Sequence, residues 1–130
     1  MTKENKEILL KDICGRLPYG VKVQIKNEIV VLDSICDDNG YYFNFIDGDR
    51  EGVNIEQIKP YLFPLSSMTE EQCKELEKLD PEFYSIICDD GNIYVSMDIK
   101  GYDWLNKNHF DYRGLIPKDL AIDATGLNVY

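Results

Sequence analysis

The pattern between residues 21 and 46 restricts the fold of this chain most. Apolar side chains occupy every second position over residues 21–25, which is the period of a half-buried strand. The β-branched run at 29–36 predicts a more central strand, and Asn39-Gly40 supplies the two positive-φ positions of a type I′ hairpin turn. In the segment 41–46, Tyr41, Phe43 and Phe45 fall on one face of a predicted strand. With a further short strand around 53–55, this region predicts a small, bent antiparallel sheet with the character of an SH3-like, partly open barrel.

Helical periodicity flanks the predicted sheet. Over residues 3–14, apolar side chains repeat four positions apart, which predicts an N-terminal helix, and Gly15 is well placed to end it in a left-handed conformation. Thr69 and Gln72 have the spacing of a capping box, so a second helix is predicted from there to about Leu79. Its apolar edge is narrow, and we therefore expect this helix to lie on the surface.

The remaining segments carry weaker patterns. The apolar stretch 61–63 lies between two prolines and is interpreted as a rigid connector. A second hairpin is predicted over 84–97, a short helix over 102–108, and an edge strand in the tail after Leu115. Together the elements predict one α+β domain over residues 1–130, consisting of an N-terminal helix, a bent sheet, a capped surface helix and an aromatic C-terminal segment.

The balance of charge limits the classes of partner. The chain has 130 residues and a net charge of −10, with 24 acidic and 14 basic side chains. The phosphate backbone would repel such a protein, so direct binding to nucleic acid is not expected. The acidity has two interpretations. It keeps the protein soluble, or it forms an acidic face that imitates nucleic acid and inhibits a DNA-binding enzyme.

The N-terminus and the cysteines both indicate in which compartment the protein lies. The charged N-terminus lacks the features of a signal peptide, and no apolar stretch is long enough to span a membrane, so we expect a cytoplasmic protein. Cys14, Cys36, Cys73 and Cys88 show no paired zinc-ligand spacing, and each lies in an apolar context. We therefore predict that they are reduced core residues.

No complete catalytic, cofactor or metal motif is present in the sequence. Residues 47–52 begin like a calcium loop, but position 12 of that loop is Ile58 in place of the required glutamate. Neither a phosphate-binding glycine loop nor a serine-nucleophile or zinc-protease motif occurs. We expect no metal and no cofactor. A small hydrolase that uses Cys88 or Cys36 with His109 stays open as an alternative, because sequence cannot show whether the side chains meet.

The window 102–116 is the best candidate for a binding surface. It contains the only tryptophan, Trp104, the only histidine, His109, and one of three arginines, Arg113. Together with Tyr112, these are residue types that carry binding energy at protein interfaces or pack into cores.

Packing is the favoured interpretation for part of this window, because aromatic residues in small domains are mostly buried. Trp104 and Phe110 are therefore expected to clamp the tail to the sheet, whereas Tyr112 and Arg113 are expected to form an exposed edge. The binding candidates are Tyr112, Arg113, Trp104 and His109.

Four segments resemble a known group of sequences. Residues 14–23, 58–72, 102–116 and 120–130 are similar to a family of small uncharacterised proteins from gut Bacteroidales and their phages or mobile elements. The family has no established activity or catalytic residues to transfer. What the resemblance implies is a cytoplasmic, phage-related accessory protein that binds and modulates a host or phage component. The predicted function is therefore non-enzymatic protein–protein interaction. The partner and the oligomeric state do not follow from the sequence.

Overall fold

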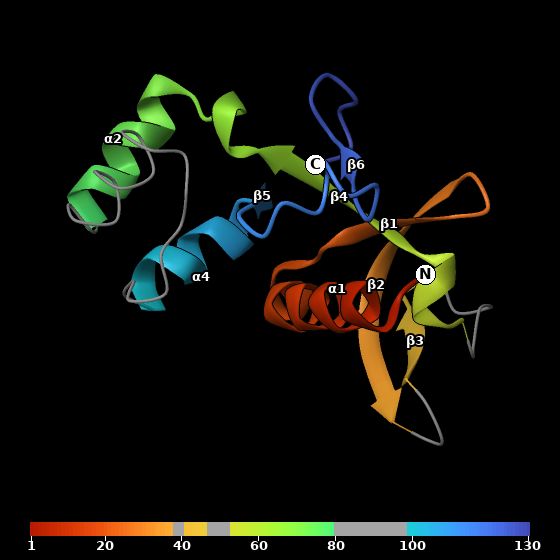
Figure 1. Cartoon of the computed structure of the whole chain (residues 1–130). Coiled ribbons are helices and arrows are strands. Elements are labelled where there is room, and N and C mark those ends of the chain that lie inside the picture. The colour runs from red at the N-terminus through yellow and green to blue at the C-terminus, as the bar shows by residue number, and fades with distance from the viewer. Residues whose placement is uncertain (38–40, 47–52, 80–98) are drawn as a thin grey trace.

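The computed structural model describes residues 1–37, 41–46, 53–79 and 99–130 (Figure 1). Within these ranges the chain has an α+β fold, in which an N-terminal helix packs on an open sheet and a pair of helices lies beside it. The helices are α1 (Lys3–Arg16), α2 (Glu70–Leu79) and α4 (Ile99–Lys107). The strands are β1 (Lys22–Ile25), β2 (Glu28–Asp37), β3 (Tyr41–Phe45), β4 (Lys59–Pro64), β5 (Phe110–Asp111) and β6 (Ile122–Asp123).

The sheet is open and mixed. Its strand order is β3-β2-β1-β4-β5, and β6 also pairs with β4. Strands β1 to β4 are joined by antiparallel pairs, whereas β5 and β6 run parallel to β4 over two residues each. The predicted α+β class and the predicted edge strand in the tail are therefore confirmed. The two short parallel pairs were not predicted, and the strands that the structure describes do not close into a barrel.

The N-terminal meander forms where the alternation predicts it. Val23 and Ile25 of β1 are buried, and Lys26 and Asn27 adopt positive φ angles in the turn to β2. The register of β2 against β3 shifts between Leu32 and Ser34, an irregularity of the kind that bends a strand and increases its twist. The predicted Asn39-Gly40 turn lies outside the described residues.

Strand β4 corrects the prediction of a connector. Pro60 pairs with Val23 of β1, and β4 continues to Pro64, where it meets β5. The two prolines obscured a strand because proline cannot donate to a ladder and is uncommon inside sheets. The strand predicted around 53–55 is only a single bridge at Val53, after which a 3₁₀ helix, η2 (Ile55–Gln57), begins.

The helix boundaries show a different role for Gly15. α1 continues to Arg16, so the prediction that Gly15 ends the helix is wrong. A Cβ at this glycine would lie 3.3 Å from Nδ2 of Asn106, which means that glycine permits the close approach of α1 and α4. Gly20, with φ of 67°, adopts the left-handed conformation after the 3₁₀ helix η1 (Leu17–Tyr19).

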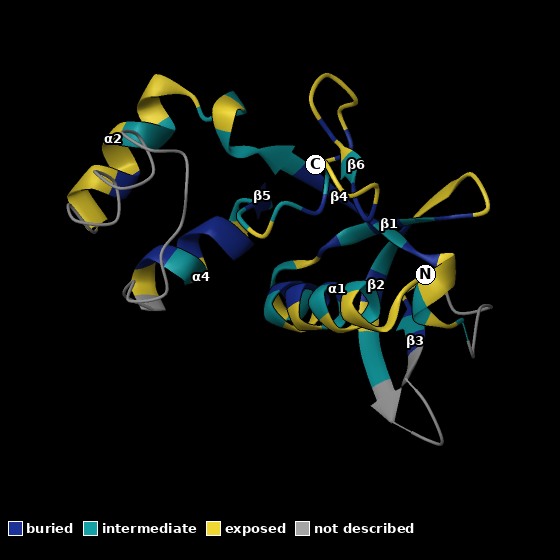
Figure 2. Ribbon diagram, in the orientation of Figure 1, coloured by how far each residue is buried: buried dark blue, intermediate teal, exposed yellow. Residues whose placement is uncertain are grey.

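The capping box of α2 is confirmed. The backbone N–H of Gln72 donates to Oγ1 of Thr69 at 3.1 Å, and the N–H of Thr69 donates to Oε1 of Gln72 at 2.9 Å. Leu76 is the buried residue of this helix, which otherwise lies largely on the surface (Figure 2).

The buried apolar residues form separate clusters. The largest lies between α1 and the sheet and includes Leu9, Ile13 and Phe43. A second cluster joins α2, α4 and β5, and its buried members are Leu76, Trp104, Leu105 and Phe110. Trp104 and Phe110 are buried as predicted, with their rings stacked at 5.7 Å between centroids, but their cluster packs α2 and α4 against β5 and does not clamp the tail to the sheet as expected.

The prediction that the cysteines are core residues is wrong for Cys14, which is exposed on α1, and Cys73 is only half-buried. The side chain of Cys36 and the whole of Cys88 lie outside the described residues. So do the predicted hairpin over 84–97 and the loop 47–52. No helix in the described ranges is long and apolar enough to cross a membrane.

Candidate functional site

The four predicted binding residues fall in three places. Trp104 faces α2 from within α4, His109 follows α4 and packs against the C-terminal residue, and Tyr112 and Arg113 follow β5 and contact α1. The structure therefore brings Tyr112 and Arg113 together but does not gather all four into one site.

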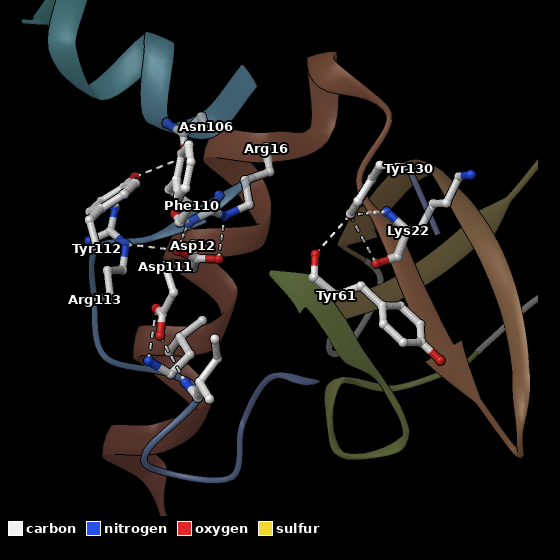
Figure 3. A network of polar contacts seen from close by, with 12 residues as sticks. Asp12, Arg16, Lys22, Tyr61, Asn106, Phe110, Asp111, Tyr112, Arg113 and Tyr130 are labelled. Atoms are coloured by element: carbon white, nitrogen blue, oxygen red, sulfur yellow. Dashed lines mark hydrogen bonds and ion pairs between the residues drawn. The ribbon is translucent and has the colours of Figure 1, made fainter. Parts of the chain in front are cut away.

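Tyr112 and Arg113 belong to a network around a buried ion pair (Figure 3). Asp12 and Arg16 have fully buried side chains, joined by Nε–Oδ2 and Nη2–Oδ1 hydrogen bonds of 2.7 and 3.0 Å. Nη2 of Arg16 also donates to the carbonyl oxygen of Phe110 at 2.6 Å, which fastens α1 to β5. Nε of Arg113 lies 3.4 Å from Oδ1 of Asp12. The ion pair is thus bounded by Arg113 on the side of Asp12 and by the backbone carbonyl of Phe110 on the side of Arg16.

Tyr112 fills the space beside this ion pair. Its ring centroid lies 5.2 Å from the guanidinium carbon of Arg16 and 5.0 Å from that of Arg113. The hydroxyl group donates to Oδ1 of Asn106 at 2.9 Å. The side chain of Arg113 is 34% exposed, so only part of it is available at the surface. The edge predicted as an exposed contact is engaged mainly in internal contacts.

His109 is held in a setting that favours its neutral form. Its ring stacks on Tyr130 with centroids 3.7 Å apart and planes inclined by 10°. Burial, reinforced by the positive charges of Arg16 and Lys22, lowers the pKa of His109 to about 4. Its Nδ1 is buried and has no hydrogen-bond partner among the described residues. At neutral pH this imidazole is uncharged and is a weak base.

Tyr130 completes the packing on the other side of His109. Its hydroxyl donates to the carbonyl oxygen of Tyr61 at 2.8 Å and accepts from the backbone N–H of Lys22 at 2.9 Å (Figure 3). Burial raises the pKa of the Tyr130 hydroxyl to about 12. Nζ of Lys22 donates to the carbonyl of Val129. These bonds fasten the tail across β1 and β4.

The alternative of a cysteine–histidine hydrolase requires a cysteine thiol beside His109. The thiol pKa of Cys14, on the surface of α1, is raised by partial burial, which disfavours the reactive thiolate. The pairs of His109 with Cys36 or Cys88 stay a prediction, because neither thiol is described. Within the described ranges, no three histidine, cysteine or acidic side chains are grouped to hold a metal ion.

Trp104 lines a cleft of about 600 Å³ between α2 and α4. One face of α4 lines it, at positions spaced by three or four residues. These residues are Lys100, Asp103, Trp104 and Lys107.

The last turns of α2 form the opposite wall of this α2–α4 cleft. They contribute Glu75, Lys78 and Leu79, again spaced by three and four residues, and Tyr19 of η1 also lines the cleft. Nε1 of Trp104 donates to Oε1 of Glu75 at 3.0 Å, so the indole is fixed across the two helices. The cleft is therefore lined by faces of both helices and by the aromatic residues Trp104 and Tyr19.

The cleft differs in charge from the chain as a whole. Its described lining contains three lysines and two acidic side chains, whereas the net charge of the protein is −10. Trp104 was a candidate binding residue from the sequence, whereas the lysines around it were not. Lys107 lies on the helix that was predicted over 102–108, whereas Lys100 precedes that range and belongs to α4 only because the helix begins at Ile99. The opposing wall depends on how α2 packs.

Comparison with protein-family models, curated proteins and solved structures finds no match to this chain. The site is therefore interpreted from its geometry alone.

Proposed function

We propose that this protein is a non-enzymatic interaction module that binds a segment of a partner protein in the α2–α4 cleft. The observation that supports this proposal most is the cleft itself, which is lined by one face of each helix and includes Trp104 in its lining. Its volume of about 600 Å³ falls in the range of ~300–1,000 Å³ that is usual for ligand pockets.

The chemistry of the lining suits recognition of a protein segment. Trp104 and Tyr19 are of the types that dominate interface energetics, since each combines large rigid area with a polar group. Leu79 is 43% exposed at the edge of the cleft, which leaves apolar surface that a partner would cover. Grooves between helices commonly accept the apolar face of a peptide.

The internal contacts of Tyr112 and Arg113 move the proposed surface away from the edge that the sequence favoured. Both side chains surround the buried Asp12–Arg16 pair, so replacing them would disturb the fold as well as any interface. Trp104 is the predicted binding residue that also lines the cleft. The resemblance to small phage-associated proteins supports an accessory role in the cytoplasm, in which the protein modulates its partner by binding.

A peptide-display selection on the immobilised protein tests this function. Peptides selected on the wild type are expected to lose at least about tenfold in affinity for Leu79→Ser, because the substitution places a hydroxyl in the apolar part of the cleft. Ile29→Ser is the matched control, since Ile29 is exposed to a similar extent but lies on β2. Selection of peptides that bind both variants equally, or of none, contradicts the proposal.

A further inference from the structure

We infer that the segment bound in the α2–α4 cleft is acidic and inserts an apolar side chain beside Trp104. This inference rests on the proposed function, and it specifies the chemistry of the partner. The charge of the cleft, the arrangement of its lysines and the position of its apolar surface support it.

Two of the three lysines of the cleft are available to a ligand. Lys78 and Lys107 are exposed and form no ion pair with other described residues, and Lys100 lines the same cleft. One of the two acidic residues, Glu75, already accepts the indole hydrogen bond of Trp104. A segment with carboxylates would therefore meet several cations in a protein whose net charge is −10.

The two lysines of α4 indicate how far apart the acidic groups should lie. Lys100 and Lys107 are seven residues apart on one face, which corresponds to about 10 Å along the helix axis at its usual rise. An extended peptide covers the same length in about three residues, and a helical peptide in about seven. Trp104 lies between the two lysines in sequence. The matching ligand places an apolar residue between two acidic ones.

A protein segment fits these observations better than nucleic acid does. A nucleic acid would offer phosphates to the same lysines, but its charged backbone continues beyond any single cleft. There it would meet a protein with 24 acidic and 14 basic side chains, and the mutual repulsion would oppose binding. A short acidic segment satisfies the local lysines without that cost.

The test extends the display selection with charge variants. Peptides that depend on Leu79 are expected to be enriched in aspartate and glutamate around an aromatic or aliphatic residue. The double variant Lys78→Glu, Lys107→Glu should weaken their binding by about tenfold or more, because it replaces attraction by repulsion. Lys118→Glu serves as the control, since Lys118 is exposed and does not line the cleft.

The possible outcomes separate the two proposals. Neutral or basic peptides that require Leu79 but tolerate the double charge variant would overturn the acidic partner and leave the interaction module standing. Peptides that are insensitive to Leu79 would overturn both. Displacement of the selected acidic peptides by oligothymidylate at equal molar concentration would also overturn this inference, because it would show that the cleft prefers a phosphate backbone. Resistance to oligothymidylate, together with loss of binding in the double variant, would support it.

Discussion

Replacement of Asp12 by asparagine tests the internal network that fastens α1 to β5. The substitution keeps the size of the side chain but removes the charge that faces Arg16. Arg16 is fully buried, and its Nε and Nη2 atoms lie 2.7 and 3.0 Å from the two carboxylate oxygens. The variant would leave a buried guanidinium without its counter-charge, and Arg113 would lose the negative charge that lies 3.4 Å from its Nε.

The expected loss of unfolding free energy is about 3–5 kcal/mol, the usual cost of removing one partner from a buried ion pair. This is a large fraction of the ~5–15 kcal/mol that stabilises an ordinary domain. The hydrogen bond from Arg16 to the carbonyl of Phe110 offsets little of it, because that bond exists already in the wild type. Nη1 of Arg16 has no partner among the described residues, which adds to the sensitivity of this position.

Equilibrium unfolding in urea measures the loss, with fluorescence of Trp104 and circular dichroism as independent signals. Lys59→Met is the matched control, because its ion pair with Asp119 joins side chains that are 40% and 90% exposed. That variant should lose less than about 1 kcal/mol. A loss below about 1 kcal/mol for Asp12→Asn, equal to that of the control, would refute the claim that the buried pair holds the helix to the sheet.

Three further substitutions test other parts of the fold. Gly15→Ala should lower the melting temperature, because the new Cβ would lie 3.3 Å from the buried side-chain amide of Asn106. This contact is expected to outweigh the preference of about 1 kcal/mol that alanine has over glycine in a helix. A higher melting temperature would contradict this expectation. The pKa of His109 is lowered to about 4, so as pH falls from about 6.5 to about 4 the unfolded state takes up the proton first and stability decreases. His109→Asn should lose this part of the pH dependence of the melting temperature, and asparagine tolerates the positive φ of 64° at this position. Melting temperatures of variant and wild type that change in parallel with pH would contradict this role of His109. Tyr130→Phe removes the hydroxyl that donates to the Tyr61 carbonyl and should cost about 1 kcal/mol in urea unfolding, whereas an unchanged midpoint would show that the tail is held by other contacts.

Local patterns in the sequence were sufficient for several elements. The alternation over residues 21–25 gave β1, and the spacing of Thr69 and Gln72 gave the start of α2, because each depends on neighbouring residues only. β4 was missed since Pro60 and Pro64 are uncommon in sheets, and its place is set by β1 on one side and by the tail on the other. Contacts of that kind join distant segments and leave little trace in a local pattern.

The candidate site was also predictable only where it depends on local sequence. Trp104 was selected as a candidate binding residue from its type, and Lys107 lay on the helix predicted around it. The cleft exists only because Glu75 and Leu79 of α2 face that helix, which depends on tertiary packing. The role of Arg113 was also hidden, because its contact with Asp12 joins residues from opposite ends of the chain.

The indole N–H signal of Trp104 in a ¹⁵N–¹H correlation spectrum gives the most direct test of the central claim. The chain has one tryptophan, so this signal is unique, and its group lies in the cleft bonded to Glu75. Titration with an acidic peptide selected by display should shift the signal to saturation, and the double variant Lys78→Glu, Lys107→Glu should largely abolish the shift. An indole signal that stays in place while the peptide binds and perturbs resonances on the sheet would contradict the assignment of the α2–α4 cleft as the binding site.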